Sequence, residues 1–364
     1  MNVPFVRLQP QNEALRAAIL EETAGVLDRS SLIRGQRCED FEEAFGAYLG
    51  GQEVIGCGNG LDALRLILGA LGIGPGDEVI VPAHTFIATA LAVTAVGAAP
   101  VFADIEPDYF SLSPSSLEAA ITERTRAVIV VHLYGQAGRW EDLEAIARRA
   151  GLILIEDAAQ AHGAEWDGKK AGTLGLAGAF SFYPTKNLGA LGDAGAVVTG
   201  DPALAERVRM LGNYGSREKY HHELEGINSR LDELQAAFLF RKLPFLDEWN
   251  RSRRMAASRY LTEIQNPRIR LPAVNPRGTP VWHVFPVLCE KRDALAAHLA
   301  DRGIGTLVHY PTPMHLHDAF SRFGGKIGDF PIAEQVCARE LGLPMFAGIT
   351  EAEVTAVIEA VNEF

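Results

Sequence analysis

Short apolar runs alternate with helical segments along much of the chain, and this alternation limits the possible folds more than any other feature. The runs at 100–105, 127–131 and 152–155 are predicted strands, and helices are predicted at 114–122 and 140–150 between them. Strands joined in this way form right-handed crossovers and lie parallel in one sheet. The unbroken apolar run at 152–155 is typical of a strand buried on both faces. The alternation therefore predicts an α/β fold built on a mostly parallel sheet.

Chemically reactive side chains follow two of the predicted strands. Glu156 and Asp157 come directly after one strand, at the edge where open α/β sheets bind their ligands, and Lys186 follows the apolar run 177–183. Burial there would lower the pKa of the lysine and leave part of it nucleophilic at pH 7. Pyridoxal phosphate needs a lysine for its Schiff base and a carboxylate on its pyridine nitrogen. Asp157 and Lys186 are therefore the predicted catalytic pair; the alternatives are a helix N-cap and an exposed lysine.

A glycine-rich turn joins a predicted strand at 54–57 to a predicted helix at 61–71. The turn consists of Gly58, Asn59 and Gly60. Backbone N–H groups at a helix N-terminus attract phosphate, so we expect a phosphate site here. The alternative is a plain strand-to-helix turn, because such a short glycine pattern is weak evidence by itself.

Length and charge limit the classes of protein that fit this chain. At 364 residues it exceeds a single typical core, which predicts a large domain at 10–243 and a smaller one at 244–364, with 1–9 packed against the latter. The formal charge of −12 argues against nucleic-acid partners and a basic membrane patch. The first residues lack the apolar core of a signal peptide, and no apolar stretch reads as a membrane span.

The cysteines suggest a reducing compartment. The four are scattered and form no C-x-x-C pair, which fits a cytoplasmic protein and argues against structural zinc. The adjacent His221 and His222 have no carboxylate cluster or second ligand pair nearby, so no metal site is predicted.

Several segments together resemble one protein family. In chain order they are Gly58–Leu64, Thr85–Thr89, Glu156–Gly163, Ser181–Gly189 and Asn228–Ala237. They resemble the DegT/DnrJ/EryC1/StrS family of sugar aminotransferases, and the resemblance covers nearly the whole chain. It implies a fold-type I enzyme that depends on pyridoxal 5'-phosphate. Such an enzyme has a large cofactor-binding α/β domain with a mostly parallel sheet and a smaller α+β C-terminal domain.

The resemblance also implies roles for individual residues around the cofactor. Phe86 would lie flat on the cofactor ring, although an ordinary core position is the alternative. Gln160 would bind the ring hydroxyl. Ser181 and the turn at 58–60 would hold the phosphate. Many relatives carry Thr or Ser where this chain has Leu61, so one hydroxyl contact to the phosphate is missing here.

One implied cofactor contact crosses to a second subunit. In the family, the residue matching Asn228 reaches the cofactor phosphate of the neighbouring subunit. The resemblance therefore implies an obligatory homodimer with composite active sites. The alternative for Asn228 is a simple N-cap of the helix predicted at 231–241.

Residues in two loops and beside the lysine are the predicted substrate contacts. They are Tyr183, Tyr214, His309, Tyr310 and His315. Prolines fix the loop around residue 310, and its polar side chains suit a sugar or its diphosphate. For the histidines, core or interface positions are the alternative.

Further details resemble the branch that aminates C3 of a dTDP-3-keto-6-deoxyhexose, giving dTDP-3-amino-3,6-dideoxyhexoses for cell-surface glycans. The matching segments are Phe86–Ala90, His132–Gln136, Tyr220–His222 and His309–Pro311. The resemblance implies a ping-pong transamination with glutamate as the amino donor. A C4-aminating enzyme is the near alternative. A cofactor-dependent sugar dehydratase, which carries His where this chain has Lys186, and a non-catalytic regulator fit less well.

Overall fold

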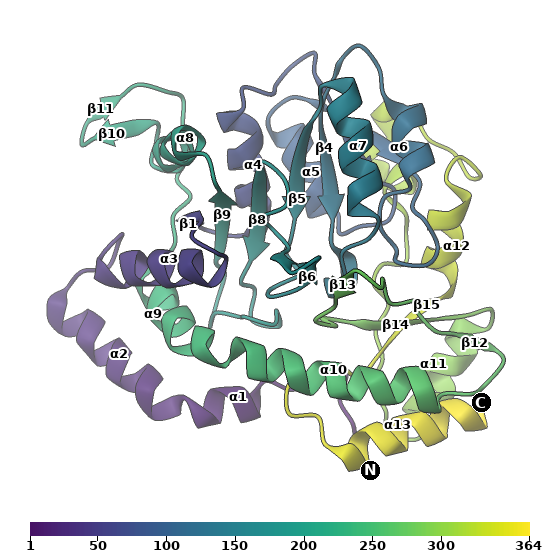
Figure 1. Cartoon of the computed structure of the whole chain (residues 1–364). Helices are drawn as coiled ribbons and strands as arrows, with labels where there is room; N and C mark the ends of the chain where they lie inside the picture. Colours follow the sequence, from purple (N-terminus) through teal and green to yellow (C-terminus); the bar gives the residue numbers. More distant parts are fainter.

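A seven-stranded sheet forms the centre of the computed structural model, which describes all 364 residues (Figure 1). Its strand order is β1-β9-β8-β5-β4-β2-β3, and β9 alone runs antiparallel to its neighbours. The mostly parallel α/β sheet predicted from the sequence is confirmed. The strands are β1 (Glu53–Cys57), β2 (Glu78–Pro82), β3 (Ala99–Ala103), β4 (Thr125–Val131), β5 (Ile153–Asp157), β8 (Ala177–Ser181) and β9 (Gly195–Thr199).

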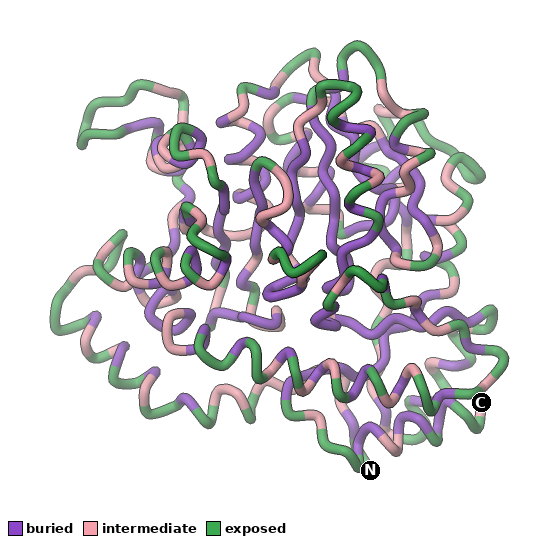
Figure 2. The backbone as a smooth tube through the Cα atoms, in the orientation of Figure 1, coloured by how far each residue is buried: buried purple, intermediate pink, exposed green.

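The sheet is buried because successive side chains along each strand enter different cores. Val79 and Val81 of β2 pack with α4 and α5, whereas Ile80 between them packs with α6 and α7. Because successive side chains point to opposite faces of the sheet and both sets are apolar, both faces must be covered by helices. Figure 2 shows the central strands as the buried part of the fold. The covering helices are α3 (Gln36–Tyr48), α4 (Gly60–Ala70), α5 (Ala88–Ala95), α6 (Pro114–Ala120), α7 (Trp140–Ala150) and α8 (Pro202–Gly212).

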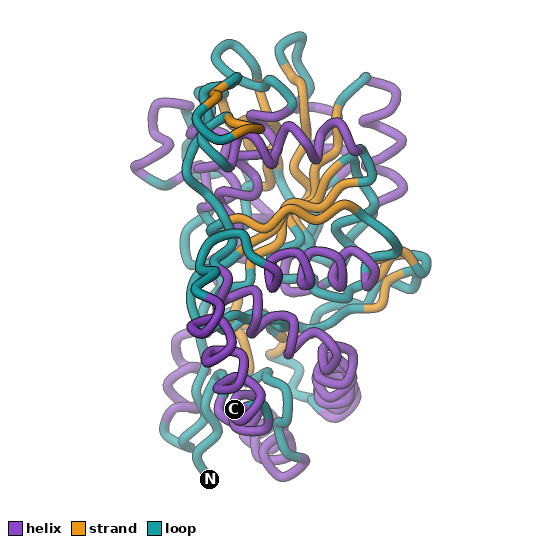
Figure 3. Tube along the Cα trace, turned by 90° about the vertical axis from the view of Figure 1, so that its left-hand side faces the viewer, coloured by secondary structure: helices purple, strands orange, loops and turns teal.

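A second, smaller sheet lies in the C-terminal part of the chain. It is antiparallel, with the order β12-β14-β15. Its strands are β12 (Ile269–Arg270), β14 (Phe285–Cys289) and β15 (Glu340–Leu343); the helices that pack on it are α10 (Leu246–Glu263), α11 (Arg292–Ala300) and α13 (Glu351–Glu363). Val3 is buried in the same core and pairs with Ile304. Figure 3 shows this part below the large sheet and its helices.

The two parts of the chain share packing. Val284 and Val336 belong to the core around the large sheet, although both lie in the C-terminal third of the chain. The domain boundary at residues 243 and 244 therefore stays a prediction. The segment before β14 is attached to the large part of the chain, because the N–H groups of Val281 and His283 donate to the carbonyls of Gly135 and Tyr134.

The remaining elements lie around these two sheets (Figure 1). Near the N-terminus, Leu15 separates two helices, α1 and α2. No helix is both long and apolar enough to cross a membrane. The further elements are α1 (Gln9–Ala14), α2 (Arg16–Arg29), α9 (Glu233–Lys242), α12 (Pro331–Arg339), β6 (Glu165–Trp166), β7 (Lys169–Lys170), β10 (Ser216–Glu218), β11 (His221–His222) and β13 (Gly278–Thr279), with short 3-10 turns at Leu133–Gly135, Leu243–Phe245, Met314–Leu316 and Asp318–Phe323.

Candidate active site

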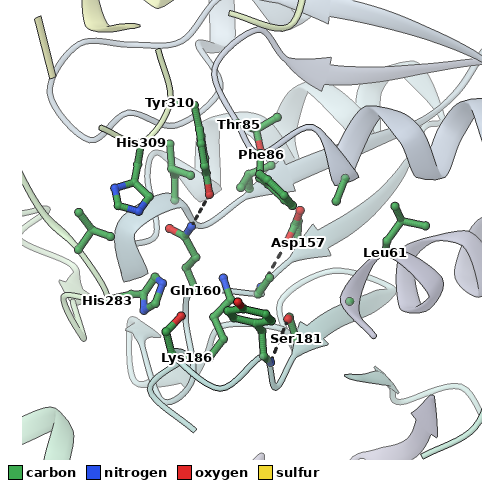
Figure 4. A pocket seen from close by; sticks show the side chains of 18 of the residues that line it. Leu61, Thr85, Phe86, Asp157, Gln160, Ser181, Lys186, His283, His309 and Tyr310 are labelled. Atoms are coloured by element: carbon green, nitrogen blue, oxygen red, sulfur yellow. Dashed lines mark hydrogen bonds between the residues drawn. The ribbon is translucent and has the colours of Figure 1, made fainter. Parts of the chain in front are cut away.

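A cavity of about 540 Å³ lies at the carboxyl ends of β5 and β8. Ten of the predicted site residues line it: Asn59, Gly60, Phe86, Asp157, Gln160, Ser181, Tyr183, Lys186, His309 and Tyr310. We call Asp157, Gln160 and Lys186 the floor of the cavity, and His309 and Tyr310 its wall. Figure 4 shows both groups of side chains around the same space.

Lys186 brings an amine into the cavity from the loop between β8 and β9. Its side chain is half-buried, and its Nζ makes no hydrogen bond or ion pair with another residue. Burial lowers the pKa of Lys186 to about 8, and the nearby Asp157 opposes this shift. A fraction of the amine is therefore neutral at pH 7, which is the state that attacks a carbonyl.

Asp157 is the last residue of β5 and is buried. Its Oδ2 accepts a hydrogen bond from the Thr89 hydroxyl at 2.8 Å, and its Oδ1 accepts the Ala159 N–H at 3.2 Å. Burial raises the pKa of this carboxyl, while these two donors and Lys186 lower it. No helix begins after Asp157, so the N-cap alternative is wrong. The contact of Thr89 with Asp157 was not predicted from the sequence. The available signal was a threonine within an otherwise apolar helix.

Gln160 has a fixed amide orientation. Its Oε1 accepts the backbone N–H of Tyr134 at 2.7 Å, and its Nε2 lies 3.2 Å from the Tyr310 hydroxyl (Figure 4). Because the oxygen is already bound, the amide presents its NH₂ group to the cavity and can donate to an oxygen there. Tyr134 was not predicted, because its contact with Gln160 depends on a loop from a neighbouring strand.

The start of α4 closes one end of the cavity. Gly60 and Leu61 line it, and the first N–H groups of a helix lack intrahelical acceptors. A Cβ on Gly60 would lie 2.7 Å from the Cβ of Ser181, so glycine permits this close approach. The Asn59 side chain caps α4 by accepting the Asp62 N–H at 2.9 Å. These groups fit a phosphate at the helix N-terminus.

Aromatic rings flank the cavity. Phe86 is 52% exposed, and its ring centroid lies 5.3 Å from that of Tyr310. The alternative of an ordinary core position for Phe86 is therefore wrong. Tyr183 also lines the cavity and is 52% exposed. An exposed aromatic ring beside the buried carboxyl fits the flat ring of pyridoxal phosphate.

His283 is a cavity residue that sequence reasoning missed. The Asn187 amide nitrogen donates to Asn250 and to the Val281 carbonyl, so its Oδ1 accepts from Nδ1 of His283 at 3.2 Å. Burial, together with the charge of Lys186, holds the pKa of His283 well below its usual range. The ring is therefore neutral, with a bare Nε2 as a hydrogen-bond acceptor. The residue lies just before β14, where no pattern marks it.

His315 does not line the cavity. Its side chain is buried, its Nε2 lies 3.1 Å from Glu334 Oε1, and its ring packs against Phe330 with centroids 4.7 Å apart. The predicted substrate contact is therefore wrong for His315 within this chain, because packing turns its ring into the fold. The core alternative is correct here.

Three other predicted residues lie outside the cavity of this chain. Gly58 donates its N–H to the Ser229 hydroxyl at 3.0 Å. Tyr214 is exposed, with the Arg230 guanidinium 5.4 Å from its ring centroid. Asn228 is exposed and pairs with Asn213. The N-cap alternative for Asn228 is wrong, because α9 begins after Asp232.

The fold, together with the placement of Lys186 and Asp157 in one cavity, defines a pyridoxal-phosphate enzyme of fold type I. The residues present fit this cofactor, since the cavity combines an amine, a buried carboxyl, an amide donor and a helix N-terminus. The profile of the DegT/DnrJ/EryC1/StrS aminotransferase family matches residues 13–362. The chain belongs to this family, whose members are pyridoxal-phosphate-dependent aminotransferases.

Individual relatives match along nearly their whole length. The chain is 49% identical to dTDP-3-amino-3,4,6-trideoxy-alpha-D-glucose transaminase of Streptomyces venezuelae, covering 100% of this chain and 96% of the relative. It is 46% identical to dTDP-3-amino-3,6-dideoxy-alpha-D-galactopyranose transaminase of Aneurinibacillus thermoaerophilus, covering 100% and 99%. The crystal structure of DesV from S. venezuelae superposes with a TM-score of 0.97 at 49% identity, covering 100% and 98%.

Proposed function

We propose that this chain transfers an amino group to a nucleotide-linked ketosugar, converting a dTDP-3-keto-6-deoxyhexose to the dTDP-3-amino-3,6-dideoxyhexose. Glutamate is the proposed donor and the mechanism is ping-pong. The observation that carries the proposal is the placement of Lys186 and Asp157 in one cavity at the carboxyl ends of β5 and β8. The two relatives, both named as transaminases of dTDP-3-amino sugars, support the sugar and the C3 position.

The floor residues divide the chemistry between them. When bound, pyridoxal phosphate supplies an electron sink for the carbon that gains or loses a proton. Lys186 would hold the cofactor through its amine and would carry a proton to and from the substrate carbon as base and acid. Asp157 would keep the pyridine nitrogen protonated, and the NH₂ group of Gln160, whose oxygen is already bound by the Tyr134 N–H, would donate to an oxygen of the cofactor.

The wall and its neighbours bind the sugar in this proposal. Tyr183, His309 and Tyr310 line the same cavity as Lys186 and offer polar groups to the hexose. His283 adds an acceptor for a hydroxyl, because its ring is neutral. Ser181 and the N-terminus of α4 hold the cofactor phosphate.

We also propose a homodimer in which Asn228 of one subunit completes the phosphate site of the other. Its exposed position outside the cavity of its own chain supports this arrangement. Tyr214, close to Asn228 through the pairing of Asn213 with Asn228, would contact the substrate in the same cross-subunit way. A cytoplasmic location is proposed because all four cysteines are free and buried.

An absorbance scan with pyridoxal phosphate and amino sugars tests the proposal. We expect the wild-type protein to show the band of lysine-bound cofactor, and Lys186→Ala to lack it before any sugar is added. dTDP-3-amino-3,6-dideoxygalactose should convert the wild-type band to that of the pyridoxamine form, whereas a 4-amino isomer should not. Conversion by the 4-amino sugar alone would reassign the position to C4. Absence of any cofactor band would refute the mechanism.

A further inference from the structure

The wall of the cavity is fixed from behind by two buried side chains. Glu340, the first residue of β15, is fully buried, and its Oε2 accepts the His309 N–H at 2.6 Å. The Tyr134 hydroxyl donates to the His309 carbonyl at 2.5 Å. Both polar groups of the His309 main chain are thus bound by residues that do not line the cavity, while the rings of His309 and Tyr310 do line it.

The Glu340 carboxyl has no counter-ion. Its Oε1 is buried without any hydrogen-bond partner. Arg292 of α11, whose charge acts on this carboxyl, donates to Asp293 and to the backbone carbonyl of Glu340 at 3.3 Å, not to the carboxyl. Burial raises the pKa of Glu340 to about 8, although the His309 N–H and Arg292 lower it. A buried carboxyl with one donor and no ion pair favours its neutral form.

The other titratable groups around Glu340 supply no positive charge. They are Tyr134 after β4, Cys337 of α12 and Tyr310 of the wall. Burial raises the pKa of each of these three groups, which keeps them uncharged at neutral pH. Arg292, which makes no hydrogen bond to the carboxyl, is therefore the only positive charge that would partly offset a negative charge on Glu340.

We propose that Glu340 is a positioning residue for the sugar: in its protonated form it holds the wall in place, and loss of its proton favours opening of the wall because it leaves a buried charge without an ion pair. The inference rests on the proposed function only in assigning the wall to the sugar. When the wall opens and Glu340 meets water, its pKa returns toward the ordinary value of 4.5. The closed form therefore binds the proton more tightly, and the free energy of opening falls as pH rises from that value to about 8.

Amide hydrogen exchange at His309 tests the device without cofactor or substrate, so its failure is distinct from failure of the proposed function. After correction for intrinsic rates, we expect the protection of this amide in the wild-type protein to fall by up to about tenfold per pH unit between pH 6 and 8. Glu340→Gln keeps an oxygen acceptor and cannot ionise, so its protection should not depend on pH. Wild-type protection that stays constant over this range would overturn the proposal, whatever any variant does.

Steady-state kinetics connect the wall to the sugar. Between pH 7 and 9 we expect KM for the dTDP-ketosugar to rise about threefold or more in the wild type and to stay constant in Glu340→Gln. The pH dependence of kcat should be the same in both proteins. Glu42→Gln is the matched control: this carboxyl accepts the Gly56 N–H, and burial raises its pKa, but it lies on α3. It should keep the wild-type pH dependence. A KM rise that persists in Glu340→Gln would contradict the proposal.

Discussion

The floor and the wall of the cavity face the same space but are built differently. Asp157 ends β5 and Lys186 follows β8, so two hydrogen-bonded parallel strands set their separation. His309 and Tyr310 arrive much later in the chain, on the irregular segment between α11 and α12, and depend on Glu340 and Tyr134 for their position. A sheet edge gives the reacting groups a rigid base, whereas a loop held by a few side-chain contacts can vary with the substrate.

Among the floor residues, we expect substitution of Lys186 to reduce activity most. Lys186→Ala removes both the cofactor attachment and the proton-transferring group, so we expect kcat to fall by at least about 10⁴-fold. Steady-state transamination of the dTDP-amino sugar measures this loss, and circular dichroism checks that the variant is folded. Residual activity within tenfold of the wild type would mean that the floor is not the reactive part of the cavity.

Asp157→Asn should have the next largest effect. It keeps the shape of the side chain and can still accept from Thr89, but it removes the negative charge beside the pyridine nitrogen. We expect kcat to fall by about 10²- to 10³-fold, because an electrostatic group aimed at the reacting system is lost. Asp193→Asn, on the exposed rim of the same cavity, is the control and should change kcat by less than threefold.

The lowered pKa of Lys186 predicts a pH dependence for cofactor capture by the apoprotein. The amine reacts when neutral, and its pKa of about 8 places the transition there. The rate of capture should rise about tenfold per pH unit below pH 8 and level off above it. Stopped-flow absorbance measures the rate. A rise that continues to pH 10 would show that the floor does not perturb this lysine.

Removing a polar group from the wall should alter binding more than chemistry. Tyr310→Phe deletes the hydroxyl that lies 3.2 Å from Gln160 Nε2 and leaves the ring beside Phe86. We expect KM for the sugar to rise by about three- to tenfold with kcat within twofold, the size of one net hydrogen bond. A loss confined to kcat would show that Tyr310 contributes to the chemical step, like the floor residues, and not to sugar binding.

The smallest effect on activity is expected for His315. His315→Ala removes its contacts with Glu334 and Phe330 behind the cavity. We expect the free energy of unfolding to fall by about 1–3 kcal/mol while KM and kcat stay within twofold. Thermal unfolding and steady-state kinetics on the same preparation separate the two outcomes. A large rise in KM would show that substrate binding depends on His315.

The sequence predicted the floor of the cavity better than the wall and the residues behind it. Residues beside a recognisable strand, such as Asp157 and Lys186, were predicted to meet because parallel strands share one carboxyl edge. Tyr134 and Glu340 were missed, because their roles depend on contacts between segments far apart in the sequence. His315 was misplaced because the sequence of an irregular loop carries no period that says which side faces inward.

By itself, the sequence predicted the α/β architecture, and it predicted that Lys186 and Asp157 meet at one site. It could do so because hydrophobic periodicity and strand ends are local features that leave a direct pattern in the chain. Only the tertiary structure decided the orientation of the Gln160 amide, the tautomer of His283 and the isolation of the Glu340 carboxyl. Hydrogen-bond partners and desolvation depend on every segment that packs around a group, and one-dimensional spacing does not contain that information.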